Sequence, residues 1–180
     1  WQLRPAWLGL RGSVAADCCT PQPLPWQALL AAGGARLALG DATSHWPAEP
    51  LAGLGTPWNT VQPQGRLTLA TEGLAAQWNQ GRLTLTGHAR LDALRVSSRL
   101  STLQPMGSYQ LDLEGGTTPT LRLQTLDGSS LLLTGAGQWV GQRLRFTGEA
   151  SAAPGREAAL ANLLNIIGRR SGARSLISIG

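Results

Sequence analysis

The stretch 64–69, Gln-Gly-Arg-Leu-Thr-Leu, recurs unchanged at 80–85, a spacing of 16 residues. In each copy the leucines alternate with arginine and threonine, a pattern typical of a strand with one buried face. A spacing of 16 residues accommodates one strand, a turn and the start of a second strand. The repeat therefore predicts successive antiparallel hairpins.

The alternation continues well beyond the second copy and predicts one long strand. One side of it carries Leu83, Leu85, Gly87, Ala89, Leu91 and Ala93. The other side carries Arg82, Thr84, Thr86, His88, Arg90 and Asp92. Because residues alternate between the faces of a strand, we expect one face to be buried and the other to be wet or covered by a partner.

Further segments with a period of two follow at 109–114, 121–124, 131–133 and 143–149. Asp127-Gly128 between two of them is a strong hairpin signal. At the C-terminus the period changes, because Leu160, Leu163, Leu164 and Ile167 have the spacing of an amphipathic helix. The prediction is a mainly β protein: a strongly twisted or rolled antiparallel sheet of successive hairpins, with the C-terminal helix packed on it.

The 180 residues are expected to form a single domain with three parts. Residues 1–63 are predicted to be irregular, with a short helix over 26–32, a strand near 35–40 and a proline-rich loop over 41–63. Residues 64–153 are predicted to form the antiparallel meander. Residues 154–180 are predicted to hold the helix and a last short strand near 176–179.

Composition excludes several chemistries. All 15 basic residues are arginine, so there is no P-loop lysine and no Schiff base. Two histidines and two adjacent cysteines do not make a tetrahedral zinc framework, and we expect no metal and no cofactor. The arginines are scattered despite the net charge of +5, which argues against nucleic-acid binding. Adjacent Cα atoms are about 3.8 Å apart, below the usual disulfide span, so one or both of Cys18 and Cys19 are interpreted as buried thiols.

No catalytic motif is convincing, and no catalytic residues are predicted. The stretch 135–141 is rich in glycine, but a strand pattern follows it where a dinucleotide fold needs a helix. His45 is placed in a loop. His88 lies on the polar side of the long strand without a nucleophile near it in sequence. Asp112 and Glu114 share a strand face, which is more typical of a solvated surface than of a hydrolytic pair.

The segments 103–109, 128–150 and 163–170 resemble type II secretion system protein N, the general secretion pathway N component. The resemblance implies the periplasmic domain of a single-pass inner-membrane protein, whose membrane helix would precede Trp1. It implies a non-enzymatic accessory component of protein secretion. Such a component would scaffold the inner-membrane assembly platform and contact the outer-membrane secretin. The family is similar to AsmA-like proteins, whose repeated strands build long curved sheets.

Two binding modes follow as hypotheses. The first is docking of other secretion subunits on an exposed polar face, with partner-binding residues Arg82, His88, Arg90, Arg143 and Arg145. The alternative is a lipid- or lipopolysaccharide-binding module, which would need an open groove lined by Leu83, Leu85, Leu111 and Leu121. A third hypothesis, a hydrolase, would need a nucleophile and a base converging near His88 or Asp112.

Overall fold

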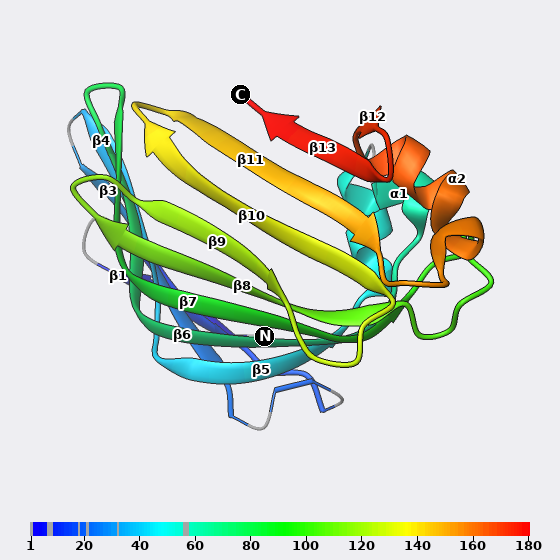
Figure 1. Cartoon of the computed structure of the whole chain (residues 1–180). Coiled ribbons are helices and arrows are strands. Elements are labelled where there is room, and N and C mark those ends of the chain that lie inside the picture. Colours follow the sequence, from blue (N-terminus) through cyan, green and yellow to red (C-terminus); the bar gives the residue numbers. More distant parts are fainter. Residues whose placement is uncertain (1, 7–8, 18, 21, 32, 56–57) are drawn as a thin grey trace.

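One antiparallel sheet runs through the chain (Figure 1). The computed structural model describes residues 2–6, 9–17, 19–20, 22–31, 33–55 and 58–180. Within these residues the sheet has 13 strands. They are β1 Gln2–Ala6, β2 Gly9–Val14, β3 Leu24–Ala31, β4 Gly34–Leu39, β5 Ala42–Pro47, β6 Gln64–Asn79, β7 Arg82–Ser97, β8 Gly107–Gly116, β9 Thr120–Thr125, β10 Leu131–Val140, β11 Arg143–Ala152, β12 Arg169–Ser171 and β13 Arg174–Ile179.

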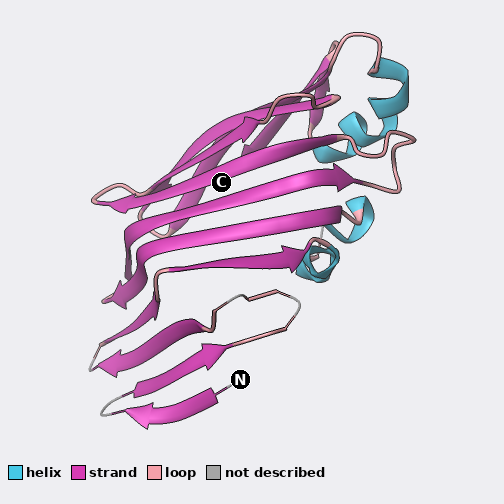
Figure 2. Cartoon of the chain, turned by 90° about the horizontal axis from the view of Figure 1, so that it is seen from below, coloured by secondary structure: helices cyan, strands magenta, loops and turns pink. Residues whose placement is uncertain are grey.

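Nearly every strand pairs with its neighbour in sequence, so the prediction of successive antiparallel hairpins is confirmed. Strand β6 is the branch point, because β5 pairs with its first half and β4 with its last residues. At the other end of the order β13 lies between β11 and the three-residue β12. Figure 2 shows the N-terminal strands continuing the sheet on the side away from the C-terminal helix.

The repeated hexapeptide opens both members of the longest hairpin. The copy at 64–69 begins β6 and the copy at 80–85 begins β7, and the two strands run antiparallel. The copies therefore lie at opposite ends of the hairpin. Along β7 the predicted alternation holds, with Leu85 and Ala89 buried and Thr84 and Arg90 exposed.

A pair of glycines interrupts the regular pairing of the two long strands, and Figure 1 shows both strands bending upward toward the turn that joins them. Gly73 of β6 and Gly87 of β7 both have positive φ, +57° and +81°. The register of β6 on β7 shifts between Glu72 and Ala75, which is the signature of a β-bulge. A Cβ on Gly87 would lie only 2.2 Å from the backbone of Gly73. The bend thus depends on the absence of a side chain at this crossing.

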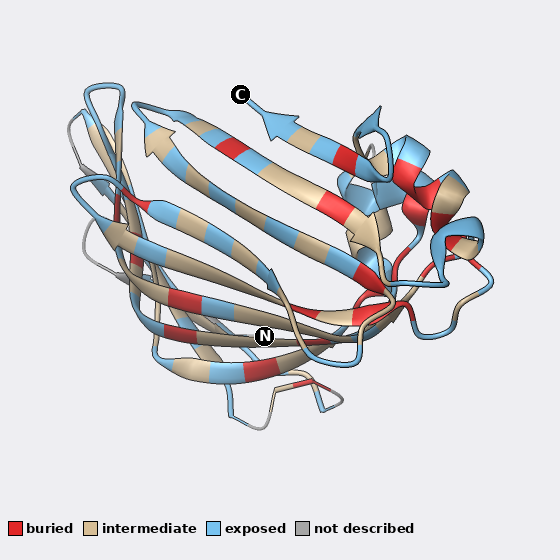
Figure 3. Ribbon diagram, in the orientation of Figure 1, coloured by how far each residue is buried: buried red, intermediate tan, exposed pale blue. Residues whose placement is uncertain are grey.

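The principal hydrophobic core lies where the C-terminal helix α2, Glu157–Ile167, packs on the sheet. Figure 3 shows buried residues gathering at this end, while most of the remaining sheet is intermediate or exposed. The helix confirms the predicted 3.6-residue pattern. The buried members of the cluster are Val61, Met106, Tyr109, Leu131, Ala150, Leu160, Leu163 and Leu164.

The prediction of a short helix over 26–32 is wrong. Strand β3 occupies Leu24–Ala31 and pairs with β2 on one side and β4 on the other. The alanines and leucines of this stretch are good helix formers, but pairing on both edges overrides that local preference. The predicted loop over 41–63 contains β5, the 3-10 helix η1 (Glu49–Leu54) and the short helix α1 (Trp58–Val61).

Tyr109 gives a direct test of this core, because it is the only tyrosine in the chain. Its buried hydroxyl donates a hydrogen bond to the Leu131 carbonyl at 3.1 Å. Burial raises the pKa of the Tyr109 phenol above its ordinary value of 10.0. The phenol therefore stays neutral in the folded state at a pH where it ionises in the unfolded chain.

We expect the folded protein to show no phenolate absorbance near pH 10, whereas the chain unfolded in urea shows it. Because the unfolded state then binds fewer protons, the free energy of unfolding should fall as the pH rises above about 10. Tyr109→Phe should lower the free energy of unfolding at neutral pH by about 1 kcal/mol. The variant should also lose much of the decrease in the free energy of unfolding at alkaline pH. Titration of the folded wild type at the ordinary tyrosine pKa would contradict this account.

Candidate functional site

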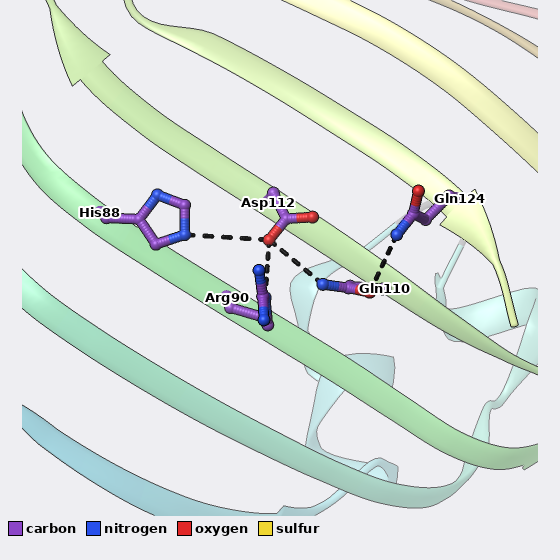
Figure 4. A network of polar contacts seen from close by, with 5 residues as sticks. All are labelled: His88, Arg90, Gln110, Asp112 and Gln124. Atoms are coloured by element: carbon purple, nitrogen blue, oxygen red, sulfur yellow. Dashed lines mark hydrogen bonds and ion pairs between the residues drawn. The ribbon is translucent and has the colours of Figure 1, made fainter.

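A connected set of polar side chains lies on the exposed face of β7, β8 and β9 (Figure 4). Asp112 is its centre. The Arg90 Nε donates to Asp112 Oδ1 at 2.9 Å, and Gln110 Nε2 donates to the same oxygen at 3.3 Å. His88 Nε2 lies 3.8 Å from it. Gln124 on β9 donates to Gln110, so three strands are tied together by one network.

The network follows from strand register. Arg90 lies directly opposite Asp112, and Gln110 lies opposite Gln124. Opposite charges in directly facing positions stabilise an antiparallel pair. The Asp112 carboxylate raises the pKa of the Arg90 guanidinium above its ordinary value, chiefly through their hydrogen bond. The ion-pair partner of Arg90 therefore lies on the neighbouring strand β8 and not on β7 itself.

The five predicted partner-binding residues fall into two groups. His88 and Arg90 belong to the Asp112 network on β7. Arg82 and Arg143 lie at two hairpin turns that meet, because Gln142 Nε2 in the turn after β10 donates to the carbonyl of Gly81. Arg145 is one outward-facing step farther along β11 and is exposed. The rolled sheet therefore brings together arginines that lie 61 positions apart in the sequence.

His88 is one of the two residues around which the hydrolase hypothesis places its nucleophile and base. Its acidic neighbour Asp112 is already engaged by Arg90 and Gln110. Among the described residues, no hydroxyl or thiol is hydrogen-bonded to His88, and its polar contact is with Asp112. Across the described ranges no group of three or more His, Cys, Asp or Glu side chains could hold a metal ion.

His45, predicted in a loop, lies in β5 instead. Its Nδ1 is 3.1 Å from the Thr68 hydroxyl on the facing strand β6. It borders a shallow pocket of about 310 Å³, which Cys19 and Trp46 also line. Cys19 is buried, as expected, but it is disulfide-bonded rather than a thiol. Cys18 lies outside the described residues.

Sequence reasoning missed an apolar face on the N-terminal strands. Leu10 faces Ala28, which faces Leu37 in turn, and Trp78 lies on the same side opposite Ala35. This face, here called the N-terminal apolar face, exposes the large side chains of Leu10, Val14, Leu30, Leu37 and Trp78. Trp26, Ala28 and Leu30 alternate along the chain, and this alternation indicates the apolar face of a strand. The helix predicted over the same stretch left that face out of account.

In the described part of the chain, no helix is both long and apolar enough to cross a membrane. The features that dominate the surface are an open-edged rolled sheet, an exposed polar network and an exposed apolar face. An apolar face of this kind on a folded domain is typical of interaction sites. Fold and surface thus define an all-antiparallel β protein with several potential binding faces.

The chain belongs to the type II secretion system protein N family, whose model matches residues 1–176. This confirms the resemblance seen in the sequence and extends it over the N-terminal third. As a structural component of the secretion apparatus, the family is generally non-enzymatic. Comparison with curated proteins and with solved structures finds no match.

Proposed function

We propose that this chain is the periplasmic domain of a single-pass inner-membrane protein that scaffolds the assembly platform of the type II secretion system. It binds other platform subunits and contacts the outer-membrane secretin during protein secretion. It holds other subunits in place and does not catalyse a reaction. Membership of the secretion family over residues 1–176 is the observation that carries this proposal.

The surface supports a docking role. Five large apolar side chains are exposed on one face of adjoining strands, and burying such a face against a partner is the main source of binding free energy. Arg82, Arg143 and Arg145 form an exposed basic group at the meeting hairpin turns, and His88 and Arg90 form the second group. The three arginines of the first group make no ion pair with the described residues, and such charges steer association with acidic partners.

Photo-cross-linking of the full-length protein in its native envelope tests the proposal. Lysine-directed reagents do not suit this chain, because these 180 residues contain no lysine. A benzophenone amino acid at Trp78, on the N-terminal apolar face, is the informative position. Trp58 is a matched control, because both tryptophans are 43% exposed and Trp58 lies on helix α1.

We expect cross-links from position 78 to other secretion subunits, identified by mass spectrometry, and few from position 58. Arg82→Glu combined with Arg143→Glu should reduce their yield about tenfold, since like charges placed together at an interface are strongly unfavourable. Arg156→Glu, in the loop before α2, should leave the yield unchanged. Equal labelling from positions 78 and 58, or labelling of lipid alone, would contradict the scaffold.

One observation favours the alternative, a lipid- or lipopolysaccharide-binding module. Leucines of β8 and β9 face one another in register, Leu111 opposite Leu123 and Leu113 opposite Leu121, and all four are only partly buried. Leu83 is also partly buried, whereas Leu85 is buried. Acyl chains copurifying with the protein, detected by mass spectrometry, would support this second function.

A further inference from the structure

The C-terminal strand β13 presents an incompletely covered sheet edge. On one side β11 pairs with it along Arg174–Ile179. On the other side β12 pairs only with Arg174–Leu176. In the part of the chain that the structure describes, no strand lies beside Ile177–Ile179 on that side. Figure 1 shows the arrow of β13 projecting past β12 and α2. Unpaired backbone groups at such an edge are a template for an added strand.

The side chains at this edge differ between the two faces. Ile177 packs against the core beneath α2, and Ile179 lies on the same face because strand residues alternate. Ile179 is 53% exposed although it points to the apolar side. Ser178 and Leu176 point to the outer face. An incoming strand would therefore need aliphatic side chains on the inner side, next to Ile177 and Ile179.

The outer side of the same edge is basic. Arg169 lies opposite Leu176 and Arg174 lies two residues before it, both on the outer face. Arg145 on β11 extends this basic surface toward the end of β13. Glu149 is the one acidic side chain paired to this group among the described residues, at 3.2 Å from Arg174 Nη1. Residues 168–180 hold three arginines and no acidic residue.

We propose that the open edge at Ile177–Ile179, here called the β13 edge, is a strand-addition site for an extended segment of a partner protein. The segment alternates aliphatic side chains, which cover Ile177 and Ile179, with acidic side chains, which face Arg169, Arg174 and Arg145. This inference rests on the proposed scaffold function and specifies the chemistry of one partner contact. Main-chain hydrogen bonds supply the affinity and the alternation supplies the specificity.

A defined probe tests the site on the purified chain. The probe is a fluorescent, end-capped peptide of about six residues with alternating valine and glutamate. Two reference peptides carry the same residues in a block order, or lysine in place of glutamate. Fluorescence anisotropy measures binding, and amide hydrogen exchange locates it. We expect the alternating acidic peptide to bind and to slow exchange at Ile177–Ile179.

Two variants report on the two halves of the site. Ile179→Asp should weaken binding of the alternating acidic peptide at least about tenfold, because it places like charge and a polar group against the incoming strand. Arg169→Glu should weaken it through the outer face. Leu54→Asp is the matched control, because Leu54 is a 69% exposed leucine on η1, and its binding should equal that of the wild type.

The β13 edge proposal is overturned if the block-order peptide binds as well, or if protection appears away from Ile177–Ile179. It is also overturned if these amides are already protected in a dimer detected by sedimentation, because the occupant is then a second copy of this chain. Either result leaves the scaffold test intact, since cross-linking from position 78 uses a different face. Conversely, if cross-linking from position 78 fails while the peptide still binds, the scaffold proposal is refuted and peptide binding at the β13 edge stands.

Discussion

Replacing Gly87 with alanine is expected to lower the free energy of unfolding by about 3–5 kcal/mol. Two costs combine. The residue has φ +81°, where an L side chain is strained, and the new Cβ would lie 2.2 Å from the carbonyl carbon and oxygen of Gly73. The three nearest atoms all belong to the β6 backbone at Glu72 and Gly73, so no flexible side chain can move aside. Urea unfolding, followed by tryptophan fluorescence, measures the change.

Gly128→Ala separates the two costs. Gly128 has nearly the same φ, +78°, but a Cβ there would meet nothing within 4 Å. That variant should lose only the conformational cost, about 1–2 kcal/mol. The difference between the variants is then the steric demand of the crossing at the bend. Equal destabilisation by Gly87→Ala and Gly128→Ala would mean that the bend does not depend on close backbone approach.

The bend matters to the surface as well as to stability. Gly87 lies between Arg82, at the meeting hairpin turns, and His88, in the Asp112 network. Straightening β6 and β7 would carry the 80–81 turn away from Gln142 and separate Arg82 from Arg143. Gly87→Ala should therefore also disrupt the basic group. Loss of the Gln142 contact to Gly81 would appear as faster amide exchange at the two turns.

Elements were predicted correctly where the local hydrophobic pattern and the strand pairing favour the same secondary structure. Leucines that alternate with threonine and arginine indicated β6 and β7, and the spacing of Leu160, Leu163 and Leu164 indicated α2. Strand β3 was missed because its alanines and leucines suit a helix about as well as a strand. Its identity is decided by β2 and β4, and a stretch read alone carries no information about its neighbours.

The candidate site could be predicted only residue by residue. His88, Arg90 and Arg143 were identified as exposed polar positions, but their grouping depends on register and on the rolling of the sheet. Arg90 meets Asp112, 22 positions away, and Gln142, next to Arg143, donates to the carbonyl of Gly81, next to Arg82. Such distant pairings are set by the whole chain. The uncovered part of β13 was equally hidden, because the three-residue β12 has no pattern of its own.

Replacing Leu164 with alanine should lower the free energy of unfolding by about 2–5 kcal/mol. Leu164 is 0% exposed and packs where α2 meets the sheet. Its loss removes buried apolar surface and leaves a cavity between two rigid elements. Ile166→Ala is the matched control on the same helix, because Ile166 is 41% exposed. Its effect should stay near 0.5 kcal/mol, as for an ordinary surface substitution.

The same substitution tests how the β13 edge is held. Helix α2 contacts β13, and Ile167 and Ile177 pack against the same cluster as Leu164. Loosening α2 should therefore speed amide exchange in β13 before it affects β6 and β7, which are paired to each other along 13 residue positions. If exchange instead rises uniformly over all strands, α2 stabilises the sheet as one cooperative unit. Strand β13 would then separate from β11 only when the whole sheet unfolds.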